Sequence, residues 1–86
     1  MSSAARHLRK RSFQLAGHRT SVALEAEFWA VLEAVAGRRG QSLAGLVAAL
    51  DAARTDPAQP LASALRVFAL AEAATPRPAA APARSP

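Results

Sequence analysis

The first part of the chain alternates apolar and polar positions before any helical pattern begins. The apolar positions of this stretch are Phe13, Leu15, Val22 and Leu24. A period of two predicts β-strand, because successive side chains of a strand point to opposite faces. Gly17 either marks a turn between two short strands or kinks a single strand, and the pattern leaves both interpretations open.

Three helices are predicted after the strand region. From Glu25 to Arg39 the apolar residues recur at helical spacing, and Gly40 suits the left-handed position that ends a helix. Ser42 is a suitable N-cap for a second helix, whose apolar stripe runs from Leu43 to Leu50 and which ends at a break around Arg54–Pro57. Prolines break the chain before a third helix from Leu61 to about Ala74. The expected core residues of the strand and the first two helices are Val22, Leu24, Phe28, Trp29, Leu32, Val35, Leu46, Val47 and Leu50.

These patterns divide the chain into three parts. Residues 1–10 are expected to form a basic flexible arm, and residues 11–74 one small domain that is mainly α-helical with one β-strand region. Residues 75–86 are rich in proline and alanine and are expected to be disordered, because such a segment has little apolar surface to bury.

The composition favours self-association. Of 86 residues 44 are apolar, but 24 of these are alanine, so few large side chains are left for a core. A single chain of this size is marginally stable, and without cysteine it forms no disulfides. We therefore expect an obligate oligomer.

The charge is concentrated at the N-terminus. Residues 1–24 carry five cations and no acid, whereas residues 25–74 carry four arginines and six acids. A basic arm on a mildly acidic body favours a polyanionic partner, of which nucleic acid is the commonest. The plainer interpretation is that the arm is only solvated.

Several classes of protein are disfavoured. No apolar stretch is long enough for a membrane span, and no secretory signal is evident, so we expect a cytoplasmic protein. His7 and His18 are the only histidines, and without cysteine they predict no metal site. The serines lack credible histidine and acid partners, so we expect neither an enzyme nor a cofactor.

The segment from Arg19 to Leu50 resembles a ribbon-helix-helix domain, the fold of the Met and Arc repressors. It is similar to a bacterial branch of that superfamily that carries the motifs GHRTSV, EFW, RRG-x-S-L and SALRVF. In this chain they stand at Gly17–Val22, Glu27–Trp29, Arg38–Leu43 and Ser63–Phe68, and the resemblance covers about residues 11–71. Ala26 departs from the branch, in which proline often opens the first helix.

The resemblance implies an intertwined two-fold homodimer in which one strand from each chain pairs into an antiparallel ribbon. A single short strand also leaves backbone groups without partners, which a symmetric pairing satisfies. The third helix would then cover the dimer, mediate a tetramer or contact another protein.

A two-stranded ribbon fits the major groove of DNA. If Val22 and Leu24 face the helices, the outward residues that contact bases are Arg19, Ser21 and Ala23. If Gly17 closes a hairpin instead, the groove-facing strand is Ser12–Leu15, with Ser12 and Gln14 outward. The expected phosphate contacts are Gln41, Ser42 and Leu43 at a helix N-terminus, together with Arg9, Lys10 and Arg11. Arg38 and Arg39 either join them or neutralise a helix C-terminus.

Other residues have structural interpretations. Phe28 and Trp29 fit core packing better than stacking on bases, and Asp51 is placed to pair with either Arg66 or Arg54. The sequence therefore predicts a dimeric DNA-binding transcriptional regulator, or an antitoxin-like relative. The alternative is a ribbon-helix-helix scaffold that serves as a protein-interaction or assembly subunit without sequence-specific DNA binding.

Overall fold

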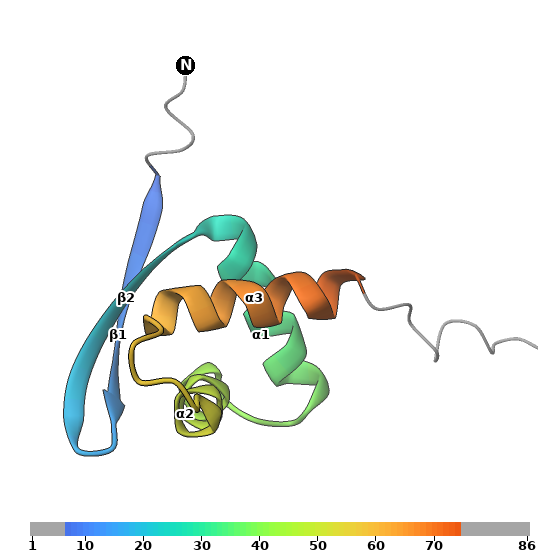
Figure 1. Cartoon of the computed structure of the whole chain (residues 1–86). Helices are drawn as coiled ribbons and strands as arrows, with labels where there is room; N and C mark the ends of the chain where they lie inside the picture. The colour runs from blue at the N-terminus through green and yellow to red at the C-terminus, as the bar shows by residue number, and fades with distance from the viewer. Residues whose placement is uncertain (1–6, 75–86) are drawn as a thin grey trace, which may run out of the picture.

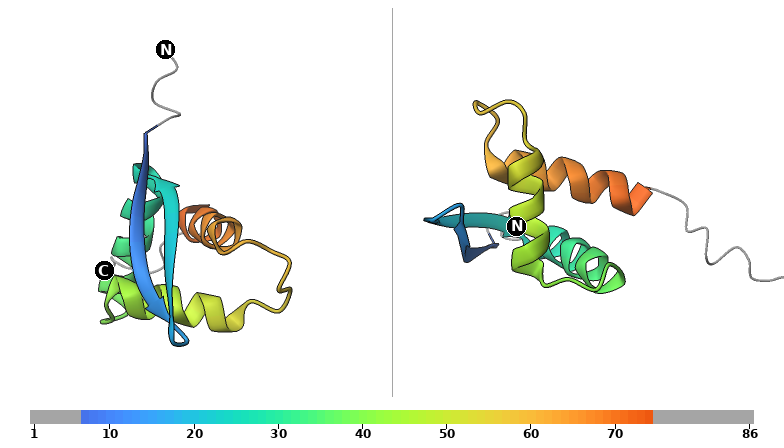
Figure 2. Two further views of the ribbon diagram at one scale, coloured as in Figure 1. Left: turned by 90° about the vertical axis from the view of Figure 1, so that its left-hand side faces the viewer. Right: turned by 90° about the horizontal axis from the view of Figure 1, so that it is seen from below.

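A β-hairpin lies against one side of three helices in the computed structural model, which describes residues 7–74 (Figure 1). The elements are β1 (Leu8–Leu15), β2 (His18–Glu25), α1 (Ala26–Arg38), α2 (Leu43–Ala53) and α3 (Leu61–Ala74). The helices cover one face of the hairpin and leave the other face open (Figure 2). No helix in residues 7–74 combines the length and the apolar character that a membrane crossing needs.

The hairpin closes through a two-residue turn. Ala16 has a φ of 49° and Gly17 a φ of 85°, the two left-handed positions of a type I′ turn, whose twist matches that of the flanking strands. β1 and β2 are antiparallel, and Leu15 lies opposite His18 next to the turn. Gly17 therefore marks a turn between two strands. The expectation of one strand per chain is wrong, because β1 supplies the partner strand within the same chain.

The N-terminal boundary also differs from the prediction. β1 begins at Leu8, so residues 8–10, assigned from the sequence to a flexible arm, belong to a strand. Their run of cations concealed the alternation that marks the rest of β1. Residues 1–6 of the predicted arm and the predicted tail of residues 75–86 lie outside the described residues.

The helix ends follow the local signals in the sequence. Gly40 adopts a φ of 66° after α1, and its N–H donates to the Gly37 carbonyl at 3.2 Å. The N–H of Gln41 donates to the Ala36 carbonyl at 3.0 Å, which completes a Schellman motif. Ser42 caps α2 by accepting a hydrogen bond from the N–H of Gly45 at 2.9 Å. The predicted end of α1 and the predicted cap of α2 are confirmed.

The core is assembled within one chain. Seven of the nine expected core residues are buried, and Phe28 and Leu50 pack against them half-buried. Further buried side chains come from β1 and α3, outside the nine residues expected from the strand and the first two helices. They are Phe13, Leu15, Leu61, Leu65 and Ala69, with Ala36 from α1. Both elements therefore contribute apolar side chains to the core of each chain.

Ion pairs join the elements around this core. The Arg66 guanidinium lies 3.1 Å from the Glu25 carboxylate and links α3 to the end of β2. Asp51 pairs with Arg54 at 2.8 Å, so of the two partners considered for Asp51 the one on its own helix is correct. Arg54 also donates to the Gln59 carbonyl, which fixes the loop before α3.

Candidate nucleic-acid interface

The open face of the hairpin brings together side chains from both strands. Directly opposite residues of an antiparallel pair point to the same face. The face turned away from the helices, called here the outer face, carries Lys10, Ser12, Gln14, Arg19, Ser21 and Ala23. Ala23 is half-buried and the other five are exposed. This face is turned toward the viewer in the left panel of Figure 2, with the helices behind it.

The register sets which outer-face residues are neighbours. Ser12 lies opposite Ser21, and their hydroxyl oxygens are 2.8 Å apart in a hydrogen bond. Gln14 lies opposite Arg19 on the turn side of these serines, and Lys10 opposite Ala23 on the other side. The serine pair therefore lies between the Arg19–Gln14 pair, which is nearer the turn, and Lys10, which is farther from it.

The structure combines two arrangements that the sequence left as alternatives. Arg19, Ser21 and Ala23 lie on the outer face, and so do Ser12 and Gln14. The missed signal was the two-residue Ala16-Gly17 loop between alternating segments, which is the length that closes a tight hairpin.

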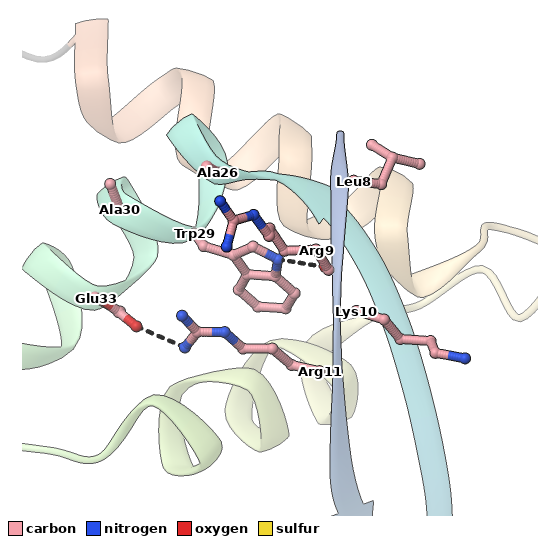
Figure 3. A pocket seen from close by; sticks show the side chains of 8 residues that line it. All are labelled: Leu8, Arg9, Lys10, Arg11, Ala26, Trp29, Ala30 and Glu33. Atoms are coloured by element: carbon pink, nitrogen blue, oxygen red, sulfur yellow. Dashed lines mark hydrogen bonds and ion pairs between the residues drawn. The ribbon is translucent and has the colours of Figure 1, made fainter. Parts of the chain in front are cut away.

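The three cations predicted as one phosphate-binding group lie on two different faces. Figure 3 shows Lys10 pointing to one side of β1, while Arg9 and Arg11 reach the other side beside Trp29. The Arg11 guanidinium lies 2.5 Å from the Glu33 carboxylate and 5.1 Å from the centroid of the indole ring. Arg11 is therefore partly neutralised, whereas Lys10 is turned toward solvent.

Trp29 belongs to the support of the hairpin. Its side chain is buried, and its indole N–H donates to the Arg9 backbone carbonyl at 2.8 Å. An open cavity of about 490 Å³ runs beside it, between β1 and the first turns of α1. Core packing of Trp29, favoured from the sequence over stacking on bases, is confirmed.

The N-terminus of α2 lies on the β1 side of the hairpin, and α2 passes behind both strands from there (Figure 2). Ser42 is exposed at this end, and Gln41 and Leu43 are half-buried. The Ser42 hydroxyl is engaged with Gly45, so the capping function is met inside the helix.

Arg38 and Arg39 contact α3. Arg38 lies 3.3 Å and Arg39 4.0 Å from the Glu72 carboxylate, and the Arg39 guanidinium lies 5.5 Å from the centroid of the Phe68 ring. Both arginines therefore join the end of α1 to α3. These contacts add a structural role to the two that the sequence suggested, which are phosphate contact and neutralisation of a helix end.

The one acid at the hairpin is also paired. Glu25 ends β2, and its pKa lies below its ordinary value, because the carboxylate accepts a hydrogen bond from its own backbone and another from Arg66. Among residues 7–74, no three histidine, cysteine or acidic side chains are grouped so as to hold a metal ion.

Comparison with models of known protein families gives a match to most of the chain. The family model described as a ribbon-helix-helix domain matches residues 8–73, more than three quarters of the chain. This range begins with β1 and extends almost to the end of α3, so both elements belong to the matched domain. Searches of curated proteins and of solved structures found no match. The chain belongs to the ribbon-helix-helix domain family.

Proposed function

We propose that the outer face of the hairpin binds the major groove of double-stranded DNA and that the protein is a transcriptional regulator. The observation that carries this proposal is the set of exposed polar side chains that both strands present on one uncovered face. A two-stranded ribbon has the dimensions of the major groove. The family generally includes DNA-binding transcriptional regulators, which supports the same function.

Arg19 and Gln14 are the proposed base readers. Their directly opposite positions point both planar groups toward the same part of a groove. A guanidinium suits the O6 and N7 atoms of guanine, and a carboxamide suits the N6 and N7 atoms of adenine. Ser21, Ser12 and Ala23 complete the contact surface with weaker discrimination, and the alanine contributes only apolar contact with a thymine methyl.

Phosphate contacts come from the flanks of this surface. Lys10 and Arg9 are exposed on β1. The N-terminus of α2, at Gln41, Ser42 and Leu43, lies beside β1 and presents backbone N–H groups. Arg11 contributes long-range charge, because Glu33 already holds its guanidinium. Contacts of this kind position the protein without reading sequence.

The experiment is selection of bound fragments from a mixed pool of genomic duplexes, followed by a salt titration. Wild type is compared with Arg19→Ala and with Arg38→Ala, a matched control that removes one surface cation on the α3 side of α1. Arg19→Ala is expected to lose about 1–3 kcal/mol of discrimination at one base pair and to keep weak, salt-sensitive binding. Arg38→Ala is expected to keep the selected sequence.

Unselective binding by wild type at ~150 mM salt would reject sequence reading by the hairpin. Equal loss of selection in Arg19→Ala and Arg38→Ala would reject Arg19 as a reader, because the effect would follow charge and not position.

A second candidate function is an assembly subunit without sequence-specific DNA binding. The observation that favours it is the exposed apolar pair Val67 and Leu70 on α3. Proteins of this family typically dimerise, and homodimerisation is part of our proposal for either function.

A further inference from the structure

The cavity between β1 and the first turns of α1 has the size of a small-molecule pocket. It encloses about 490 Å³, and its lining includes Arg9, Arg11, Ala26, Trp29 and Ala30. Pockets that bind small organic ligands usually enclose about 300–1,000 Å³. A water molecule occupies roughly 30 Å³ of liquid, so a bare inorganic ion fills only a small part of this space. We call this hollow the β1–α1 cavity.

Small and apolar side chains give the β1–α1 cavity an apolar surface. Ala26 and Ala30 lie one helical turn apart on α1, and both line the cavity. Leu8, which is 45% exposed, lines it from β1. The two alanines leave room that larger side chains would fill. The body of a ligand that fits here is therefore apolar.

Two guanidinium groups reach this cavity from β1. Figure 3 shows the side chains of Arg9 and Arg11 on either side of the Trp29 indole, whereas the ammonium group of Lys10 points to the other side of the strand. Glu33 holds Arg11 at 2.5 Å. Arg9 has no ion-pair partner among residues 7–74. Two guanidinium groups and one carboxylate leave one net positive charge, which favours a ligand with a single negative charge.

The unpaired guanidinium of Arg9 suits a carboxylate. Its planar fork donates two parallel hydrogen bonds to the two oxygens of such a group. Guanidinium groups also stack on aromatic rings, and the Arg11 guanidinium already lies 5.1 Å from the centroid of the Trp29 indole. A flat ring therefore matches both the apolar surface and the guanidinium planes of the cavity.

We propose that the β1–α1 cavity binds a small aromatic monocarboxylate, with Arg9 as the residue that holds its carboxylate. The ring lies against Ala26 and Ala30. The site faces α1 and not the outer face of the hairpin, so the proposal does not require DNA binding. Its test uses the protein without DNA, and its failure is distinguishable from failure of the proposed function.

The test is an NMR titration of the full chain with benzoate at constant ionic strength. The chain has a single tryptophan, so the indole N–H of Trp29 gives one signal that reports directly on the cavity. This signal is expected to shift saturably at millimolar benzoate. Benzamide has the ring without the charge, and acetate has the charge without the ring. Each is expected to bind at least tenfold more weakly than benzoate.

Two pairs of variants locate the carboxylate and the ring. Arg9→Gln is expected to weaken benzoate binding at least tenfold, whereas Lys10→Gln, the matched control on the opposite side of β1, is expected to bind like wild type. Ala30→Leu fills the cavity without changing its charge and is expected to weaken binding at least tenfold. Ala34→Leu is its control, because Ala34 is an exposed alanine of α1 outside the lining.

Spectra of each variant without ligand verify that these exposed substitutions leave the fold intact. The absence of a saturable shift with millimolar benzoate overturns the proposal. Equal weakening in Arg9→Gln and Lys10→Gln also overturns it, because binding would then follow the net charge of β1. Binding of wild-type strength by Ala30→Leu places the ring elsewhere, and acetate that binds as well as benzoate shows an anion site that does not recognise a ring. Either result rejects the proposed ligand site.

Discussion

The indole N–H of Trp29 donates a hydrogen bond to the backbone carbonyl of Arg9, with 2.8 Å between the two heavy atoms. This bond joins α1 to β1, the strand whose outer side carries half of the candidate DNA-binding face. The Phe13 ring, 6.0 Å away between centroids, adds a second contact between the same two elements. The position of the outer face therefore depends on a buried residue that does not belong to it.

Trp29→Phe is expected to lower the free energy of unfolding by about 2 kcal/mol. The substitution removes the hydrogen-bond donor and leaves part of the indole volume empty, and each loss contributes about 1 kcal/mol. Urea unfolding measures the total. Hydrogen exchange is expected to show the largest local loss of protection in β1. Unchanged exchange in β1 with a normal loss of stability would contradict the role of this bond in holding the strand.

The turn of the hairpin holds one residue that disfavours its own conformation. Ala16 has a φ of 49°, where a side chain with Cβ costs roughly 1 kcal/mol, and asparagine is preferred at this position of a type I′ turn. Ala16→Asn is expected to stabilise the protein by about 0.5–1 kcal/mol in urea unfolding.

Gly17→Ala is the opposite test at the neighbouring position. A Cβ atom added at Gly17 meets nothing within 4 Å. The free energy of unfolding is therefore expected to fall by about 1 kcal/mol because of the φ of 85° and not because of a clash. If Ala16→Asn and Gly17→Ala had the same free energy of unfolding, the type I′ geometry would be contradicted.

The Glu25–Arg66 pair is expected to make stability depend on pH in the acid range. The pKa of Glu25 is lowered in the folded chain by its own backbone hydrogen bond and by Arg66. Its contribution is therefore fully present above the ordinary value near 4.5 and is lost as the pH falls through the lower, folded value. Glu25→Gln is expected to be less stable than wild type at neutral pH, with a difference that shrinks in acid.

Urea midpoints taken at neutral pH and from about pH 5 downward measure this difference. Arg66→Met, alone and combined with Glu25→Gln, completes a double-mutant cycle in which the coupling is expected to vanish in acid. A coupling that stays constant with pH would show that the two residues interact by packing and not by charge.

Two glycines in helices are expected to respond differently to alanine. Gly37 lies exposed in α1, and a Cβ there meets nothing within 4 Å, so Gly37→Ala is expected to add about 0.5–1 kcal/mol of stability. At Gly45 the added Cβ lies 3.2 Å from the Ser42 hydroxyl that caps α2. Gly45→Ala is therefore expected to gain less than Gly37→Ala or to destabilise. Equal gains in thermal unfolding would contradict the importance of this cap.

The helices were predictable because their ends are set by neighbours in the sequence. Gly40 and Ser42 act within one turn of the residues that they cap, so the local sequence alone locates these helix ends. The first part of β1 was not predictable in this way. The cation run before Ser12 is typical of a solvated arm, and it becomes a strand only through partners distant in sequence, such as Glu33 and Trp29.

The candidate site was predicted in part for a related reason. Alternation assigns Arg19 and Ser21 to the side opposite Val22, and the structure shows that arrangement. Their position on the same face as Gln14 depends on the hairpin register, which is set by the Ala16-Gly17 turn. That loop has the right length but lacks the Asn-Gly pair that marks such turns most strongly.

Gln14→Ala tests whether β1 takes part in reading DNA. If both strands enter the groove, Gln14 lies beside Arg19 and contacts an adjacent base, so its loss is expected to relax selection at one position by about 1–3 kcal/mol. The slope of affinity against salt is expected to stay unchanged, because no cation is removed. Gln59→Ala, in the loop before α3, is the matched control for loss of a glutamine side chain. Selection that depends on Arg19 but is identical in Gln14→Ala and Gln59→Ala would show that β2 alone reads the groove, with β1 acting as its support.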